Sequence, residues 1–201
     1  MAGQVLASSP GGAQKVDRPD PREDDLVRAA KAGDREAFDA LLEMHGRAVL
    51  GFLEGMSGPV DAEDLAQETL LQAFRRIGTF ATGTDFRAWL LTIAYHARVH
   101  ALRRKRALVA QDFAVLASVP APAAATEGTG LEAAVRSGLA ALPEDQKTVV
   151  LLRLGQGLSH AEIARITGTE EATVRWRLFR ARRVLQKLLK EWAPIGKGSG
   201  T

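Results

Sequence analysis

Residues 158–183 read LSHAEIARITGTEEATVRWRLFRARR, and this pattern predicts two short helices joined by a tight turn. Ser159, followed three residues later by Glu162, forms a capping box that begins a helix. Gly168 suits the turn because glycine tolerates a left-handed backbone, and Thr169 can cap the second helix. Two helices in this order are typical of a helix-turn-helix, which is a DNA-binding motif.

The second of these helices divides into an apolar stripe and a basic face. We assign the stripe, which includes Val174, Leu178 and Ala181, to the core. Arginines on the opposite face can pair with guanine in the major groove or hold phosphates. The residues predicted to contact DNA on this helix are Thr169, Thr173, Arg175, Trp176, Phe179, Arg180 and Arg183, and Arg177 is placed on the same face. The alternative is a plain helical hairpin whose basic face is merely solvated.

The rest of the chain is also predicted to be helical, because no stretch sustains the alternation of apolar and polar residues that a strand requires. The predicted fold is all-α, with two small helical domains joined by a flexible linker. The predicted division is a disordered tail at 1–22, a first domain at 23–107, a linker at 108–130, a second domain at 131–192 and a flexible tail at 193–201.

The first domain begins with a helical pattern from Asp24, which ends at a break around Gly58 and Pro59. Asp61 can cap the next helix, whose apolar side is predicted to contain Leu65, Leu70, Ala73, Phe74 and Ile77. The remaining predicted elements are a turn at 78–85 and helices at Phe86–Ala107, Leu131–Ala141, Glu144–Leu154, Ser159–Thr167 and Glu170–Trp192.

Composition limits the possible functions. The chain has 201 residues, no cysteine and a formal net charge of +3, so disulfides, thiolate metal sites and a cysteine nucleophile are excluded. The sequence has neither a run of about 18 apolar residues nor the order of a signal peptide, so we expect a cytoplasmic protein without membrane insertion. Basic residues concentrate at 103–106 and 175–190, which favours two places where phosphate is neutralised.

Two motifs in the first domain read DAEDLAQETLLQAFRRIGTF at 61–80 and FRAWLLTIAYHARVHALRRKRA at 86–107. Both resemble the second conserved region of the sigma-70 family, in its minimal extracytoplasmic function (ECF) branch. The segment at 139–185, which contains the helix-turn-helix, resembles the fourth region of that family. A linker in place of the third region points to the ECF branch.

The resemblance implies a dissociable initiation factor that binds core RNA polymerase, reads the minus-10 and minus-35 promoter elements and assists DNA melting. The acidic helix would bind the clamp helices of the polymerase β′ subunit through Asp61, Asp64, Gln67, Glu68 and Leu71. Further partners implied are the β flap of polymerase, promoter DNA and an anti-sigma factor. No cofactor is expected.

In the family, the loop before the second motif captures a flipped base of the minus-10 element, and here that loop is Thr79 to Asp85. Aromatic and basic groups supply the stacking and phosphate contacts that promoter opening needs. The residues assigned to the minus-10 element are Thr82, Asp85, Phe86, Arg87, Tyr95, His96, Arg98, Arg103, Arg104 and Arg106. Trp89 is interpreted as a core residue rather than a stacking wedge. The DNA-contacting face of the second domain would read the minus-35 element.

Some positions depart from the family pattern. Tyr95-His96 and His100 stand where relatives commonly have Arg-Asn and Asp, and Trp176 replaces a usually small residue. These departures should alter recognition of both promoter elements, although Trp176 could instead pack against the linker or a partner. His96 and His100 have a spacing that can bind a metal, but no third ligand is apparent, so we predict no metal site.

Two other classes of function compete with this interpretation. A regulator that used only the helix-turn-helix would bind operator DNA without polymerase, normally as a dimer on symmetric half-sites, and would leave the first domain unexplained. An enzyme would need a catalytic motif such as a glycine-rich phosphate loop or a nucleophile elbow, and the sequence contains neither. We therefore predict a sigma factor without catalytic activity.

Overall fold

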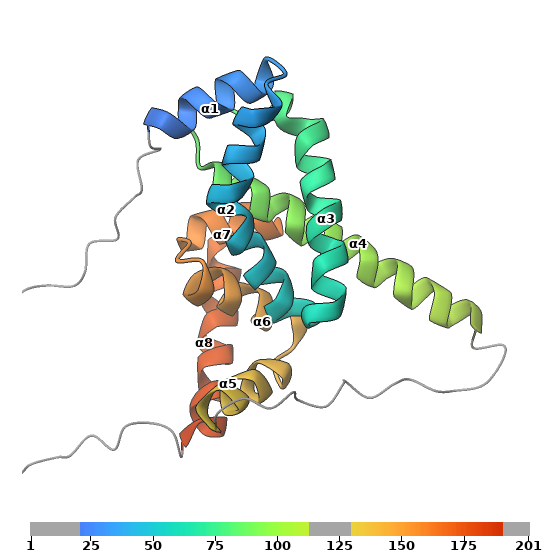
Figure 1. Cartoon of the computed structure of the whole chain (residues 1–201). Coiled ribbons are helices and arrows are strands. Elements are labelled where there is room, and N and C mark those ends of the chain that lie inside the picture. The colour runs from blue at the N-terminus through green and yellow to red at the C-terminus, as the bar shows by residue number, and fades with distance from the viewer. Residues whose placement is uncertain (1–20, 113–129, 191–201) are drawn as a thin grey trace, which may run out of the picture.

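The computed structural model describes residues 21–112 and 130–190, and every regular element in these two segments is helical (Figure 1). This confirms the predicted all-α fold. We call 21–112 the front module and 130–190 the rear module. The predicted tail at 193–201 and most of the predicted N-terminal tail and linker lie outside the described residues, whereas Pro21 and Arg22 of the predicted tail belong to the first helix.

The elements follow one another along the chain with short connections inside each module. The front module contains α1 (Pro21–Lys31), α2 (Arg35–Ser57), α3 (Pro59–Arg76), the 3₁₀ turn η1 (Ile77–Thr79) and α4 (Phe86–Asp112). The rear module contains α5 (Gly130–Ala140), α6 (Glu144–Val150), the π-helical segment η2 (Leu151–Gly155), α7 (His160–Thr167) and α8 (Glu171–Leu188).

The first helical run of the front module is divided in two, which the apolar periodicity does not predict. Gly33, with φ of 99°, turns the chain after α1. Asp34 then caps α2, because its side chain accepts hydrogen bonds from the backbone N–H groups of Glu36 and Ala37. The break therefore comes from turn and cap residues within a continuous apolar pattern.

The bounds of α3 and α4 also differ from the prediction. α3 begins at Pro59 rather than at Asp61, because proline suits the first helical position, where the missing N–H has no partner to lose. α4 continues to Asp112, beyond the predicted end at Ala107. Its second half projects away from the body of the molecule (Figure 1).

In the rear module, the helix predicted at 144–154 is α6 followed by the π-helical segment η2. The backbone of Glu170, rather than Thr169, occupies the cap position of α8. The hydroxyl of Thr169 lies 3.0 Å from the hydroxyl of Thr167, so the predicted capping role of Thr169 is wrong. The start of a helix commonly differs by one or two residues from the position that a capping pattern predicts.

Aromatic rings at the start of α4 form part of the front core. Phe86 is fully buried, and its ring centroid lies 5.3 Å from that of Phe80 and 5.4 Å from that of Trp89. Because Phe80 follows η1 directly, these contacts hold the loop at 79–85 against α4. Trp89 packs against the core and is partly buried, in agreement with its predicted role.

The two modules pack against each other through a shared core. Val149, Leu152 and Ile163 of the rear module belong to the same buried cluster as the front core, with α4 lying on α7 and α2 on η2. Gly55 permits the approach, because a Cβ atom there would stand 2.8 Å from the side chain of Leu151. The sequence predicts a separate core for each module, whereas the larger buried cluster of the structure crosses the module boundary. A smaller cluster of Leu142, Val150 and Ala181 lies within the rear module.

Polar groups surround this shared core. Arg98 donates to the hydroxyl of Ser57 at 2.5 Å and to the carboxylate of Glu144 at 3.1 Å. The ammonium group of Lys147 donates to the carbonyl oxygen of Met56 at 3.2 Å. Burial lowers the pKa of Lys147, Glu144 opposes this effect and Arg98 adds to it. We call this packing of the two modules against each other the closed arrangement. It keeps the partly desolvated Lys147 at the contact between the modules.

Candidate partner and nucleic-acid interfaces

The first candidate surface is the outer face of α3. The residues predicted to bind polymerase are all exposed there: Asp61, Asp64, Gln67, Glu68 and Leu71. Most are three or four residues apart, which places them along one side of the helix. Gln72 donates to Glu68 at 2.7 Å, so one carboxylate is held in place on this face.

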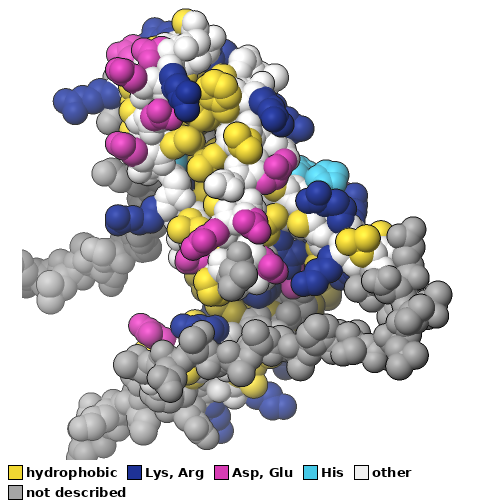
Figure 2. Space-filling model, turned by 45° about the vertical axis from the view of Figure 1, so that its right-hand side comes forward, with side chains coloured by type: hydrophobic (Ala, Val, Ile, Leu, Met, Phe, Trp, Pro, Cys, Tyr) yellow, Lys and Arg dark blue, Asp and Glu magenta, His cyan; other side chains and the backbone are white. Residues whose placement is uncertain are grey.

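Phe74 adds an apolar group to the same helix, and this was not predicted. The sequence pattern assigns Phe74 to the core, yet it is 52% exposed, beside Leu71 at 53%. Its ring contacts Phe38 edge to face, with centroids 5.2 Å apart. Figure 2 shows hydrophobic side chains interspersed with acidic ones on this side of the molecule. A mixed acidic and apolar face suits docking to a basic partner helix.

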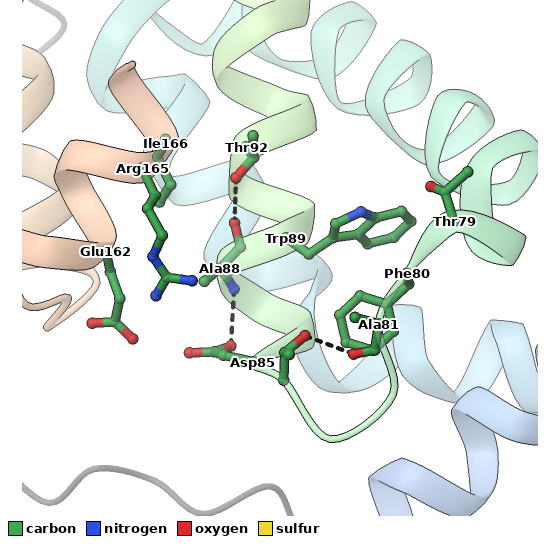
Figure 3. A pocket seen from close by; sticks show the side chains of 11 residues that line it. Thr79, Phe80, Ala81, Asp85, Ala88, Trp89, Thr92, Glu162, Arg165 and Ile166 are labelled. Carbon is green, nitrogen blue, oxygen red and sulfur yellow. Dashed lines mark hydrogen bonds between the residues drawn. The ribbon is translucent and has the colours of Figure 1, made fainter. Parts of the chain in front are cut away.

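The second candidate surface is a cavity of about 320 Å³ beside the loop at 79–85 (Figure 3). Two hydrogen bonds shape the loop: Thr84 donates to the carbonyl of Ala81 at 2.7 Å, and the backbone N–H of Ala88 donates to Asp85 at 2.9 Å. The lining residues are Thr79, Phe80, Ala81, Thr84, Asp85, Ala88, Trp89, Thr92, Glu162, Arg165 and Ile166. Hydroxyl and carboxylate groups beside a partly buried aromatic ring can hold an unstacked base.

One wall of this cavity comes from the rear module. Glu162, Arg165 and Ile166 of α7 line it opposite the loop and α4 (Figure 3). Sequence patterns give no signal for these three residues, because the contact between α7 and α4 joins segments about seventy residues apart in the chain. The cavity is therefore shared by the two modules in this arrangement.

Two residues predicted to contact the minus-10 element do not have an accessible side chain. Phe86 is 0% exposed within the aromatic core. Arg98 is 9% exposed and is held by Ser57 and Glu144. Neither side chain can reach DNA here, so their assignment as direct contacts is wrong for this arrangement. Apolar packing removes Phe86 from the surface, and the bond to Glu144 of the rear module holds Arg98 away from it.

The other predicted minus-10 residues are exposed or half-buried. Basic side chains gather where α4 leaves the body, which Figure 2 shows on the right. The exposed ones are Thr82, His96, Arg103, Arg104 and Arg106, and the half-buried ones are Asp85, Arg87 and Tyr95. His100 is exposed as well, and no three His, Asp or Glu side chains in the described segments gather as a metal site would require.

The third candidate surface is the helix-turn-helix. The capping box is confirmed, because Glu162 N–H donates to Ser159 Oγ at 3.2 Å and Ser159 N–H donates to the Glu162 carboxylate at 2.7 Å. Burial alone would raise the pKa of Glu162, but the bonds from Ser159 and the charges of Arg165 and Arg87 lower it below its usual value. Gly168 turns the chain with φ of 64°, as predicted.

On α8, Val174 and Ala181 are buried as predicted, and the opposite face is open. Arg177 is an exception, because its Nε atom lies 2.9 Å from Asp145 Oδ2 and the side chain turns toward α6. Its placement on the DNA-contacting face is therefore wrong. The exposed members of that face are Arg175, Trp176, Phe179, Arg180 and Arg183, while Thr169 and Thr173 are half-buried.

No helix in the described segments is both long and apolar enough to cross a bilayer. Two family models match the chain: "Sigma-70 region 2" over residues 41–108 and "Sigma-70, region 4" over residues 132–185. The first match contains α3 and the cavity loop, and the second contains the helix-turn-helix. Each candidate surface thus lies mainly inside a matched region.

The chain is similar to the RNA polymerase sigma-H factor of Pseudomonas aeruginosa, with 33% identity over 178 residues that cover 82% of this chain and 92% of that protein. It is 36% identical to the ECF RNA polymerase sigma factor SigM of Mycobacterium tuberculosis over 167 residues, covering 82% of this chain and 83% of that protein. Each alignment covers 82% of the chain and therefore includes residues of both modules.

Two solved structures have a similar fold. One is the sigma factor RpoE in complex with the anti-sigma factor NepR from Bartonella quintana, with a TM-score of 0.66 and 30% identity, covering 76% of this chain and 96% of that one. The other is CnrH in complex with the cytosolic domain of CnrY, with a TM-score of 0.64 and 27% identity, covering 85% of this chain and 98% of that one.

Proposed function

The chain belongs to the ECF branch of the sigma-70 family, and from this premise we propose that its two modules divide the work of promoter recognition. As a sigma factor, the protein directs RNA polymerase to promoters and is not an enzyme. The observation that carries the division is the presence, in one chain, of an exposed acidic face on α3 and an exposed basic face on α8.

The front module is proposed to bind polymerase through α3. Asp64 and Glu68 would face the basic clamp helices of the β′ subunit, and Leu71 with Phe74 would supply apolar contact. Reversing both charges, as in Asp64→Arg with Glu68→Arg, should reduce capture of core polymerase about tenfold or more without changing the fold. Glu43→Arg, an exposed change of the same kind on α2, is the control. Equal capture by both variants would contradict the assignment.

The front module is also proposed to melt the minus-10 element. A base flipped from the duplex would enter the cavity beside the loop at 79–85, where the partly buried Trp89 forms one side and the Thr84 hydroxyl and Asp85 carboxylate can bond the base edge. Unstacking a base costs a few kcal/mol, and stacking on protein returns about 1–3 kcal/mol. The exposed arginines at 103–106 would hold the adjacent phosphates.

The rear module is proposed to read the minus-35 element through the exposed face of α8. Thr173 and Arg175 lie in the first turns of that helix, which enter the major groove most deeply in helix-turn-helix proteins. Arg183 lies further along and is placed to hold phosphate. The neighbouring η2 segment and α6 are the parts of the rear module proposed to be near the β flap.

Promoter geometry then requires the modules to separate. The two elements are about 25 base pairs apart, or about 85 Å of duplex at about 3.4 Å per base pair. A compact body of about 150 residues has a radius of gyration of only about 15 Å. Residues 113–129, within the predicted linker, can span up to about 60 Å when extended. The closed arrangement is therefore proposed to open when polymerase and promoter are bound.

The remaining partners follow from the same premise. We propose that an anti-sigma factor regulates this chain, because the similar structure of RpoE contains the anti-sigma factor NepR and the similar structure of CnrH also contains a partner chain. The proposed place of action is the cytoplasm, where polymerase meets the chromosome.

Reconstituted transcription tests the proposal directly. Purified chain and core polymerase would be given a library of promoters with randomised minus-10 and minus-35 positions, and the start points would be sequenced. Initiation from a defined class of promoters, with both elements enriched, is the expected result. Start points that do not depend on the added chain would overturn it. Operator binding by the chain alone would favour the regulator class instead.

A further inference from the structure

Two arginines on α8 stack on aromatic rings. The guanidinium carbon of Arg180 lies 5.7 Å from the centroid of the Trp176 ring, and that of Arg183 lies 5.9 Å from the centroid of Phe179. Both aromatic side chains are more than half exposed, at 55% and 59%. What distinguishes them from other exposed apolar side chains is that each is paired with an arginine on the same face of α8, which makes a combined aromatic and basic surface.

Position along the helix separates the two pairs. Thr173, Trp176 and Arg180 are three and four residues apart, so they share one face that begins in the first turn of α8. Phe179 and Arg183 begin about a turn later. Early residues of a recognition helix reach base edges, whereas later ones meet the phosphate backbone. The pair formed by Trp176 and Arg180 is therefore the one placed for base reading.

Two other arginines of α8 differ from Arg180 because each has a carboxylate partner. Arg175 lies 3.4 Å from Glu171 in an exposed pair, and Arg177 is turned toward Asp145. Arg180 has no carboxylate partner among the ion pairs of the described residues, and its planar group is held over an indole ring. A guanidinium fixed in this way loses less conformational freedom when it pairs with a base.

We propose that Trp176 and Arg180 act as one reading unit that selects a thymine next to a guanine in the minus-35 element. This rests on the proposed function of the rear module and specifies its base preference. Arg180 would pair with the O6 and N7 atoms of guanine, and the exposed part of the Trp176 ring would cover the C5 methyl group of the adjacent thymine. Arginine with guanine, and apolar side chains with the thymine methyl, are the pairings that major-groove geometry favours.

The test removes either the ring or the methyl group. Holoenzyme would be assembled from core polymerase and the full chain, and its minus-35 preference would be read from a randomised promoter library. Replacing the selected thymine with uracil removes only the methyl group. We expect a loss of about fourfold in initiation, which corresponds to about 0.8 kcal/mol for one methyl group. Uracil placed between the two elements is the matched control and should have no effect.

Trp176→Ser should abolish the response to uracil and the thymine preference, while the minus-10 preference stays the same. Trp176→Phe, which keeps an aromatic face, should retain part of both. Arg180→Ala should lose the guanine preference. Since both side chains are exposed, thermal unfolding should be unchanged in all three variants.

The outcomes separate this inference from the proposed function. If Trp176→Ser holoenzyme selects the same minus-35 bases and still responds to uracil, the reading unit is overturned while the proposed function stands. If Trp176→Ser binds polymerase more weakly but its holoenzyme selects the same bases, the tryptophan serves a protein contact and the inference also fails. If the unsubstituted chain directs no initiation, both the inference and the proposed function fail.

Discussion

The two surfaces proposed to contact DNA differ in their accessibility. The cavity beside the loop at 79–85 has one wall made by α7, so the rear module stands over it. The basic face of α8 carries Trp176 and Arg180 in the open. This packed arrangement therefore restricts access to the proposed minus-10 site and leaves the proposed minus-35 site open. Binding of both promoter elements at once would therefore first require the contact between the modules to open.

The contact itself combines strong and weak features. Its centre is apolar and continuous with the front core, which favours closure. At its edge, the Lys147 ammonium group is partly desolvated and bonds a backbone carbonyl rather than a carboxylate. Glu144, which pairs with Arg98, remains half exposed. A half-exposed ion pair and a lysine bonded only to a backbone carbonyl leave the edge of the contact weakly held, so binding of a partner can open it there.

The largest expected effect comes from locking the modules together. Because the chain has no cysteine, Gly55→Cys with Leu151→Cys introduces a single possible disulfide. The Cγ atom of Leu151 lies 3.4 Å from the position of a Cβ at residue 55, so the two Cβ atoms fall near the separation that a disulfide needs. The covalent cross-link would hold the two modules in the closed state. Oxidised holoenzyme should lose nearly all promoter-directed transcription.

Reduction is the matched control for this lock. Treating the same sample with a reductant should restore transcription, and each single-cysteine variant should be insensitive to oxidation. Capture of polymerase through the exposed α3 should persist in the oxidised form. Full transcription by a chain shown to be cross-linked would refute the requirement for separation.

A smaller effect in the opposite direction is expected from Glu144→Arg. The substitution removes the partner of Arg98 and places a third cation near Arg98 and Lys147. Because Glu144 is half exposed, we expect a change of about 1 kcal/mol, or about fivefold in the ratio of open to closed chain. The radius of gyration in small-angle X-ray scattering should increase. Glu132→Arg on α5 makes the same charge change at an exposed site and should leave the radius unaltered.

The fold was predictable from sequence wherever local chemistry determines it. Ser159, Glu162 and Gly168 specify the helix-turn-helix through caps and a turn, and the structure has all three as expected. The break before α2 was missed because the cap residue Asp34 lies in a continuous apolar pattern. The start of α8 was displaced by one residue because Thr169 bonds Thr167 instead of capping.

The candidate sites were predictable only in part, for a different physical reason. Exposure of the acidic face of α3 follows from helical periodicity within one element. Burial of Arg98, inward rotation of Arg177 and the contribution of Arg165 to the cavity all depend on contacts with distant segments. Periodicity describes one helix at a time, so it cannot predict which helices meet.

The smallest expected effect concerns the cavity wall that α7 provides, where the capping box of Ser159 and Glu162 stabilises the start of the helix. Glu162→Gln keeps a hydrogen-bonding group and removes the charge that faces Arg165 and Arg87. Loss of a charge at this helix start should cost about 0.5–1 kcal/mol, or about 2 °C in Tm near pH 7.

The sign of its pH dependence follows from the lowered pKa of Glu162. A carboxyl group with a lower pKa in the folded chain contributes stability above its ordinary value of 4.5, and this contribution is lost as pH falls through the folded-state pKa. The difference in Tm between the wild-type chain and Glu162→Gln should therefore be largest at neutral pH and shrink toward zero in acid. Glu132→Gln, on exposed α5, should show no such trend. A Tm difference that grows as pH falls would mean that the charge of Glu162 does not stabilise the start of α7.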